Sequence, residues 1–154
     1  MKEKLYLDTS VIGGYFDEEF SFWTKKLFDE FINGFKIAVI SDITLFELKK
    51  APDYVQNLLF EIPVYNLERI QFNSEAEFLT SKYIENNIVS KNYISDAQHI
   101  ALASIEKINA LVSWNFKHIV NLSKIRSFNS VNLKFGFPLL EIRTPREVLN
   151  EKEI

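Results

Sequence analysis

The sequence has no cysteine, only two histidines, and four residues each of glycine and proline among its 154 positions. Without cysteine the chain cannot form disulfides, thiolate zinc sites or a cysteine nucleophile. The shortage of glycine and proline argues against long flexible linkers. No apolar run approaches the roughly 20 residues that a membrane-spanning helix needs. We therefore expect one domain over residues 1–154, in the cytoplasm and without a membrane partner.

Apolar and aromatic residues are abundant instead. They make up 47% of the chain and include 14 Phe, 6 Tyr and 2 Trp, enough to bury a sizeable core. The net charge of −3 argues against indiscriminate binding to a polyanion, but the charge is uneven. Residues 107–140 contain no acid and five cations, which are Lys107, Lys117, Lys124, Arg126 and Lys134. This segment is either a basic wall for nucleic acid or a chance asymmetry of a solvated surface.

Four apolar runs predict short buried strands, at residues 4–8, 35–41, 111–114 and 139–142. Because their apolarity is continuous rather than alternating, we expect a parallel sheet covered on both faces. Segments with helical spacing or helix start signals lie between and after them, at residues 24–33, 41–50, 53–60, 74–84, 96–107 and from 144 onward. The order predicts an α/β layered fold.

Helix starts are marked by side chains that can bond free backbone N–H groups. Ser41 and Ser95 are the expected caps of two helices, and Ser74 with Glu77 fits a capping box. Thr144, with Pro145 after it and a glutamate three residues on, predicts a last short helix.

Three carboxylates fall where ligands gather in an open parallel sheet, beyond the carboxyl ends of the strands. Asp8 ends the first strand, Glu47 lies in the helix after the second, and Asp96 lies in the first turn of its helix. Converging carboxylates would form an oxygen-ligand site for a hard divalent cation. The alternatives are a structural turn for Asp8, a surface position for Glu47 and a favourable helix-dipole contact for Asp96.

Other polar residues flank these positions. Asn115 follows the third strand, and the hydroxyls of Ser10 and Ser113 are placed to orient an acid or metal-bound water, or simply to cap the chain. His118 lies beside Lys117 and either approaches a phosphate or serves as a loop residue, whereas we expect His99 to be a core or surface histidine. Aromatic residues near Gly13 and Gly14 either stack on bases, pack, or form a self-association surface.

Four motifs together resemble the PIN-domain nucleases, which include the VapC-type toxins. They are Leu7-Asp8-Thr9-Ser10-Val11, Thr44-Leu45-Phe46-Glu47-Leu48, Ser95-Asp96-Ala97-Gln98-His99-Ile100-Ala101-Leu102-Ala103 and Ser113-Trp114-Asn115. The resemblance implies a PIN-like three-layer fold, with a central parallel sheet of about four or five strands flanked by helices.

The resemblance also implies a site. Asp8, Glu47 and Asp96 fall on the family's principal acids, which bind Mg²⁺ or Mn²⁺ and cut RNA. Asn115 falls where the family often has Asp; an amide keeps an oxygen ligand but loses a charge, so a second metal should bind more weakly. All four are our expected metal-binding and catalytic residues, with Ser10 and Ser113 supporting them.

The function implied is a metal-dependent endoribonuclease that hydrolyses RNA phosphodiester bonds, as the toxin of a toxin-antitoxin pair. Its expected partners are RNA, a protein antitoxin and a second copy of the chain. Lys117, His118, Lys124 and Arg126 are the expected RNA-binding residues. The alternative is a catalytically weakened PIN-like module that binds RNA or protein. A phosphotransferase using Asp8 as nucleophile fits less well, because Ser10 stands where haloacid-dehalogenase-like enzymes have a second Asp.

Overall fold

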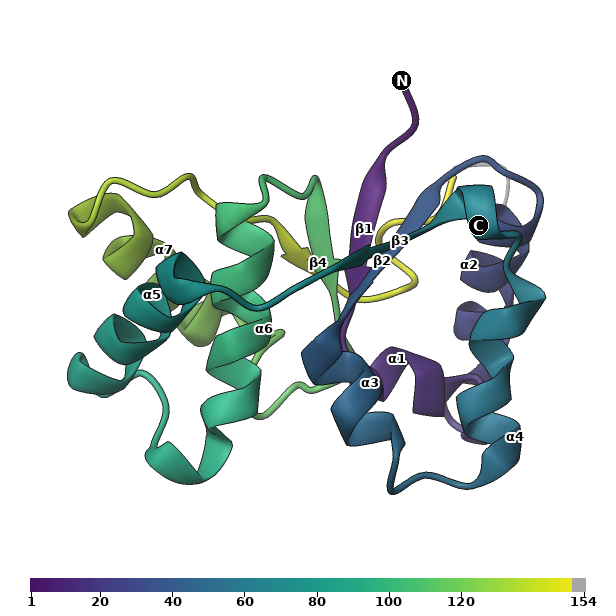
Figure 1. The fold of residues 1–154 in the computed structure, drawn as a ribbon, viewed down its shortest axis with the longest axis horizontal. Coiled ribbons are helices and arrows are strands. Elements are labelled where there is room, and N and C mark those ends of the chain that lie inside the picture. Colours follow the sequence, from purple (N-terminus) through teal and green to yellow (C-terminus); the bar gives the residue numbers. More distant parts are fainter. Residues whose placement is uncertain (151–154) are drawn as a thin grey trace.

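The structure is a computed structural model that describes residues 1–150, so the last four residues of the expected 1–154 domain lie outside it. Five parallel strands form one sheet in the order β3-β2-β1-β4-β5 (Figure 1). They are β1 (Lys4–Leu7), β2 (Ile37–Ser41), β3 (Leu67–Ile70), β4 (Ala110–Val112) and β5 (Ile142–Arg143). The central strand is β1, in which Tyr6 pairs with Val39 on one side and Leu111 on the other.

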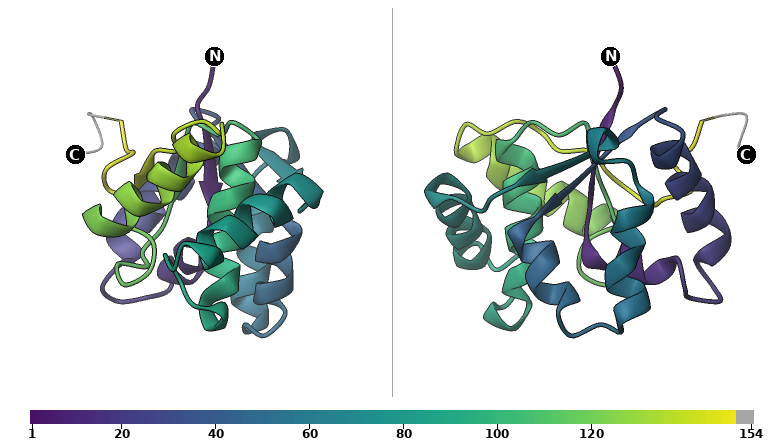
Figure 2. Two further views of the ribbon diagram at one scale, coloured as in Figure 1. Left: turned by 90° about the vertical axis from the view of Figure 1, so that its left-hand side faces the viewer. Right: turned by 45° about the vertical axis from the view of Figure 1, so that its right-hand side comes forward.

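Helices cover both faces of this sheet (Figures 1 and 2). One side has α1 (Thr9–Gly14), α2 (Ser21–Ile32), α3 (Asp42–Leu48) and α4 (Asp53–Gln56), and the other has α5 (Ser74–Glu85), α6 (Ile94–Ile105) and α7 (Leu122–Lys134). Each side has its own apolar core, because successive strand residues point to opposite faces: Leu5 and Leu7 enter one core and Tyr6 the other. The expected three-layer α/β fold is confirmed.

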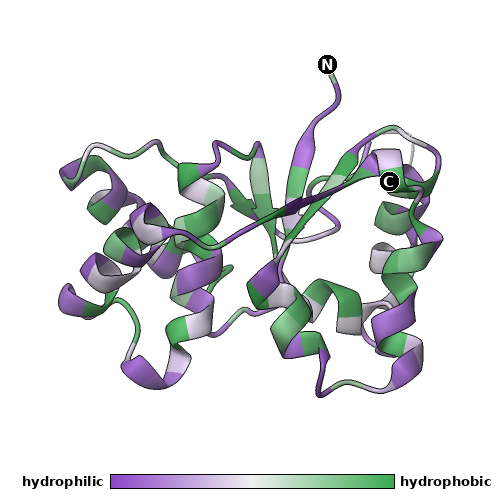
Figure 3. Cartoon of the chain, viewed as in Figure 1, coloured by the Kyte–Doolittle hydropathy of each residue, from purple (hydrophilic) through white to green (hydrophobic). Residues whose placement is uncertain are grey.

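The helices carry hydrophobic and hydrophilic residues side by side, as expected for helices that bury one face (Figure 3). Three short 3₁₀ turns, Asn57–Glu61, Val64–Asn66 and Lys91–Tyr93, complete the connections. No helix within residues 1–150 is long and apolar enough to cross a membrane.

Three elements were missed at the sequence level. Strand β3 has the sequence LERI, and its two charged residues interrupt the apolar pattern by which a buried strand is predicted. Because β3 lies at the edge of the sheet, it can carry charged residues. Helix α1 contains Gly13 and Gly14, which lower helix propensity and suggest a turn. Helix α7 lies in the stretch 115–138, to which the sequence pattern assigned no element, because only a few of its residues, such as Phe128 and Val131, are buried.

Helix starts agree with the expectations only in part. Ser41 caps α3 as expected, and it does so with Thr44 in a reciprocal capping box. Helix α5, however, is capped by Asn73, whose side chain accepts from the backbone of Ala76, so Ser74 is the first helical residue and not the cap.

Two predicted elements near later motifs also shift. Helix α6 begins at Ile94, so Ser95 lies inside it and does not cap it. Thr144 and Glu147 exchange the two expected hydrogen bonds, yet the chain there forms a turn and no helix. The backbone of Leu140 is bonded to the side chain of Asn129, so β5 starts at Ile142, three residues later than the apolar run suggests.

Candidate functional site

The carboxyl ends of β1, β2 and β4 meet at one edge of the sheet, near α1, α3 and the start of α6 (Figure 1). The strand order reverses there, because the chain leaves β1 toward β2 and later returns to the other side of β1 as β4. Ligands of open parallel sheets bind at such switch points.

Asp8 lies at the centre of this edge, directly after β1, and its exposed fraction is only 3%. Ser10 Oγ donates to Asp8 Oδ1 at 2.6 Å, and Ser113 Oγ donates to Oδ2 at 2.7 Å. Burial raises the pKa of Asp8, while His99 and these two hydroxyls oppose that rise. Ser10 and Ser113 therefore fix both oxygens of one acid from two different segments.

Glu47 approaches from α3 and is held through one oxygen. Its Oε1 accepts from Thr9 Oγ1 at 2.7 Å and from His99 Nε2 at 2.5 Å. Burial acts to raise the pKa of Glu47, but the hydrogen bond and electrostatic field of His99, together with Thr9, outweigh it and lower the pKa. The carboxylate is therefore charged at neutral pH.

His99 is the site residue that the sequence interpretation missed. It is 1% exposed, and its Nδ1 is hydrogen-bonded to the Tyr6 hydroxyl at 2.6 Å. The same hydroxyl lies 2.6 Å from Ser41 Oγ. The available signal was spacing: His99 follows Asp96 by three residues, which places both on one face of a helix.

Asp96, half-buried in the first turn of α6, completes the acidic group. Its pKa is raised to about 6 by burial and by the negative charges of Asp8 and Glu47, with His99 acting in the opposite direction. The three carboxyl groups thus lie within electrostatic range of one another. Within residues 1–150, however, no three acidic or histidine side chains are already gathered closely enough to hold an ion.

The chemistry of this donor set fits Mg²⁺ or Mn²⁺, which prefer carboxylate oxygens. Burial, followed by the charges of Asp8 and Glu47, raises the pKa of Asp96, so a divalent cation here would offset an unfavourable negative charge. Asp8, Glu47 and Asp96 are the residues that would hold it.

Asn115 lies beside the three acids, but it is hydrogen-bonded to nearby residues of the chain. Its backbone N–H donates to Ser113 Oγ at 2.9 Å, and its Oδ1 accepts from the backbone N–H of His118 at 3.0 Å. The expected fourth ligand therefore uses its side-chain oxygen to hold a turn.

The predicted basic wall divides between the two ends of the sheet. Lys107 precedes β4 at the strands' amino ends, and Lys134 ends α7 after the helix has run back from the site. Lys117 and Arg126 are exposed on the site side, and Lys124 Nζ donates to the carbonyl of Ile88. Residues 107–140 therefore do not form one wall at the site end, because the chain passes between the two ends of the sheet along β4 and again along α7. The RNA-binding role of Lys117, His118, Lys124 and Arg126 stays a prediction.

His118 stacks on Tyr93, with ring centroids 3.9 Å apart and an interplanar angle of 29°. Partial burial and the charges of Lys117 and Lys124 lower its pKa. Tyr93 is 40% exposed and directly precedes α6. In the chain, Tyr93 lies three residues before Asp96, and His118 lies three residues after Asn115.

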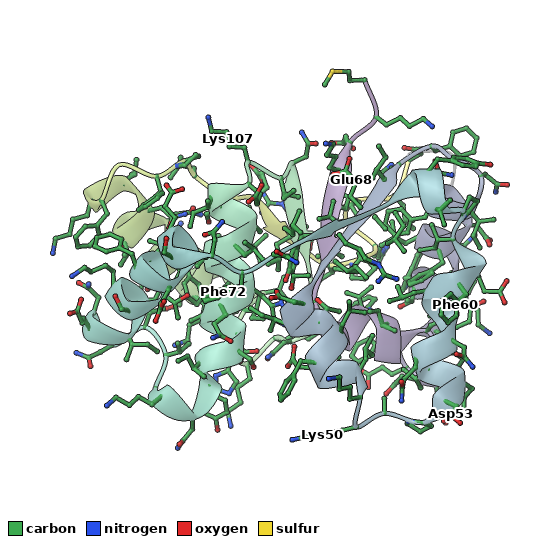
Figure 4. The ribbon with its side chains drawn as sticks, in the orientation of Figure 1. Lys50, Asp53, Phe60, Glu68, Phe72 and Lys107 are labelled. Carbon is green, nitrogen blue, oxygen red and sulfur yellow. The ribbon has the colours of Figure 1, made fainter. Side chains whose placement is uncertain are left out.

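A cavity of about 860 Å³ adjoins Glu47 between α3 and α6. Its walls include exposed apolar side chains, and Phe72 and Lys50, both labelled in Figure 4, also line it. The complete lining is Asp42, Ile43, Leu45, Phe46, Glu47, Lys49, Lys50, Phe72, Ile94, Ser95 and Gln98.

No family model matches the sequence, and no curated protein gives a significant match. Solved structures do match. VapBC2 from Rickettsia felis bound to a promoter DNA fragment is 19% identical, with 92% of this chain and 98% of that chain covered and a TM-score of 0.54. VapC20 from Mycobacterium tuberculosis, a sarcin-ricin loop cleaving toxin, is 12% identical, with 74% and 92% covered and a TM-score of 0.56.

The chain has a VapC-type PIN-domain fold. A toxin-antitoxin complex from Klebsiella pneumoniae shares it, at 16% identity, with 78% of this chain and 93% of that chain covered and a TM-score of 0.55. Because these identities are low, the match carries the PIN-domain fold alone, and the chemistry must be argued from the residues of this chain.

Proposed function

We propose that the protein is a metal-dependent endoribonuclease, the toxin of a toxin-antitoxin pair, which hydrolyses RNA phosphodiester bonds with Mg²⁺ or Mn²⁺. The observation that carries the proposal is the mutual electrostatic effect of Asp8, Glu47 and Asp96 at the switch point of a PIN-domain fold. Drawn together by a divalent cation, these carboxylates would supply the oxygen ligands that Mg²⁺ and Mn²⁺ prefer.

Such an ion, when bound, supplies positive charge at the scissile phosphate and makes water more acidic. The chain's own residues prepare for this. Ser10 and Ser113 orient Asp8, and Thr9 and His99 orient Glu47. Burial and the charges of Asp8 and Glu47 raise the pKa of Asp96 to about 6, and a bound cation would favour its ionised form.

RNA would reach the acids along four side chains at the same end of the sheet, the cations Lys117, Lys124 and Arg126 and the imidazole of His118. Lys117 and Arg126 are exposed and suited to phosphate contacts, which position a backbone without reading its sequence. The ring pair of His118 and Tyr93 offers a surface on which a base would stack.

The proposed protein partners are an antitoxin and a second copy of the chain. The similar structures include toxin-antitoxin complexes. An apolar antitoxin segment in the cavity beside Glu47 would cover the site.

The test is RNA cleavage by purified protein with Mg²⁺ or Mn²⁺, with a chelator, and by Asp96→Asn. We expect cleavage by the wild type only with metal, and activity of the variant at the level seen with chelator. Glu85→Gln is the control, because Glu85 is an exposed acid paired with Lys82. Equal cleavage by wild type and Asp96→Asn would exclude this site as the catalyst.

A second candidate is the catalytically weakened module that binds RNA or protein. The observation in its favour is Asn115, an amide whose oxygen already accepts from the backbone of His118. RNA binding without metal-dependent cleavage in the same assay would support this reading.

A further inference from the structure

We propose that His99 is a positioning residue, which holds Glu47 in the orientation needed to bind the metal ion. This inference rests on the proposed function. It extends the site inward, from the acids to a chain of side chains that runs Ser41, Tyr6, His99, Glu47.

Each link of this chain is short, and the chain is protected from water except at its Glu47 end. The hydroxyls of Ser41 and Tyr6 are 2.6 Å apart, Tyr6 Oη is 2.6 Å from His99 Nδ1, and His99 Nε2 is 2.5 Å from Glu47 Oε1. Ser41 and Tyr6 are fully buried, and His99 is 1% exposed. Both ring nitrogens are thus used, and water does not compete for them.

The donors and acceptors are consistent along the chain. Glu47 is ionised and can only accept, so His99 Nε2 carries the proton that lies between them. Burial raises the pKa of Tyr6, so its hydroxyl keeps its proton and remains a donor. In a neutral imidazole, Nδ1 therefore accepts from Tyr6, and this bond fixes the tautomer that faces Glu47.

The inner end of this row of hydrogen-bonded side chains is rigid, so it can hold the His99 ring in one orientation. Tyr6 lies in the central strand, and Ser41 ends β2 while capping α3, the helix that carries Glu47. His99 lies on α6, the helix that carries Asp96. The network thereby ties the two helices that bear acids to the sheet between them.

The experiment measures Mn²⁺ affinity by titration calorimetry without RNA, so its readout does not depend on catalysis. His99→Ala should weaken Mn²⁺ binding about tenfold, the usual effect of removing a group that orients a metal ligand. His99→Gln should retain more of the affinity, because its amide can donate to Glu47. Tyr6→Phe, which leaves the imidazole unsupported, should also weaken binding.

Tyr83→Phe is the matched control, because Tyr83 is equally buried and its hydroxyl donates to Asn132, remote from Glu47. It should lower the melting temperature without changing Mn²⁺ affinity. In a Glu47→Ala background, His99→Ala should have no further effect on affinity, since its target is gone.

Three results would overturn the inference. If the wild type binds Mn²⁺ and cleaves RNA while His99→Ala and Tyr6→Phe bind Mn²⁺ as well as Tyr83→Phe does, only the role of His99 fails. If the effects of His99→Ala and Glu47→Ala simply add, His99 acts independently of Glu47. If the wild type neither binds Mn²⁺ nor cleaves RNA, the proposed function fails as well.

Discussion

Asp96 carries a charge that the folded protein disfavours. Its pKa is raised from 3.8 to about 6, so ionising this carboxyl costs more free energy in the folded state than in the unfolded state. The free energy of unfolding therefore falls as the pH rises from 3.8 through 6. Asp96→Asn removes that penalty. With allowance for partial exposure, we expect the variant to gain about 1–2 kcal/mol of unfolding free energy at pH 8 in chelator.

The measurement is urea unfolding of both proteins between pH 4 and pH 8. The gain should shrink below pH 6 and be smallest at pH 4, where Asp96 is protonated in the folded state and about half protonated in the unfolded state. A variant no more stable than the wild type at pH 8 would mean that neither burial nor the neighbouring acids disfavour the charge of Asp96.

The three acids were accessible from sequence because each stands at a recognisable local position: a strand end, a helix after a strand, and a first helical turn. The hydrogen-bond partners of these acids could not be predicted from the sequence. Thr9 and His99 bond Glu47 across 38 and 52 residues, and no local pattern encodes such contacts. Likewise, the use of the Asn115 oxygen in a turn depends on backbone geometry at His118.

The short helix α1 depends on a close approach by Trp114, which follows β4. A Cβ on Gly14 would lie 2.7 Å from Trp114 Cδ1 and 2.9 Å from Nε1, and the indole cannot easily move, because Nε1 donates to Thr24. Gly14→Ala should therefore cost about 1–3 kcal/mol of unfolding free energy.

Gly13→Ala is the matched control, because nothing lies within 4 Å of a Cβ there. It should be neutral or stabilising by up to about 1 kcal/mol, since alanine favours a helix over glycine. Denaturant unfolding of the two variants checks both signs. Equal effects at the two positions would mean that the indole yields to the added methyl group.

The strands that were predicted well are those whose burial is nearly complete. Strands β1 and β2 are continuous apolar runs because helices cover both faces. Strand β3 and helix α7 were missed because each is half-exposed, so polar residues interrupt the pattern. Asp8 directly follows the well-predicted β1, whereas Glu47 and Asp96 lie on helices α3 and α6, so the errors at β3 and α7 leave these three positions unchanged.

The cations of residues 107–140 form one segment in the sequence but lie at two opposite ends of the sheet in the structure. Lys117→Glu combined with Arg126→Glu, at the site end, should weaken binding to single-stranded RNA of any sequence and flatten its salt dependence. Lys107→Glu combined with Lys134→Glu makes the same charge change at the other end and should have little effect.

Fluorescence anisotropy at several salt concentrations checks this pair. If both double variants lose affinity equally, net charge and not a defined path governs RNA binding.

The hydrogen bond from Ser113 to Asp8 joins positions 105 residues apart, and it forms only when β4 docks beside β1. During synthesis, Asp8 and Glu47 therefore emerge from the ribosome long before the strand that completes their surroundings. We expect a nascent or interrupted chain that ends before β4 to contain all three acids but no organised site. By the same reasoning, a protease that removes everything beyond α5 abolishes the site entirely, although it leaves Asp8 and Glu47 intact.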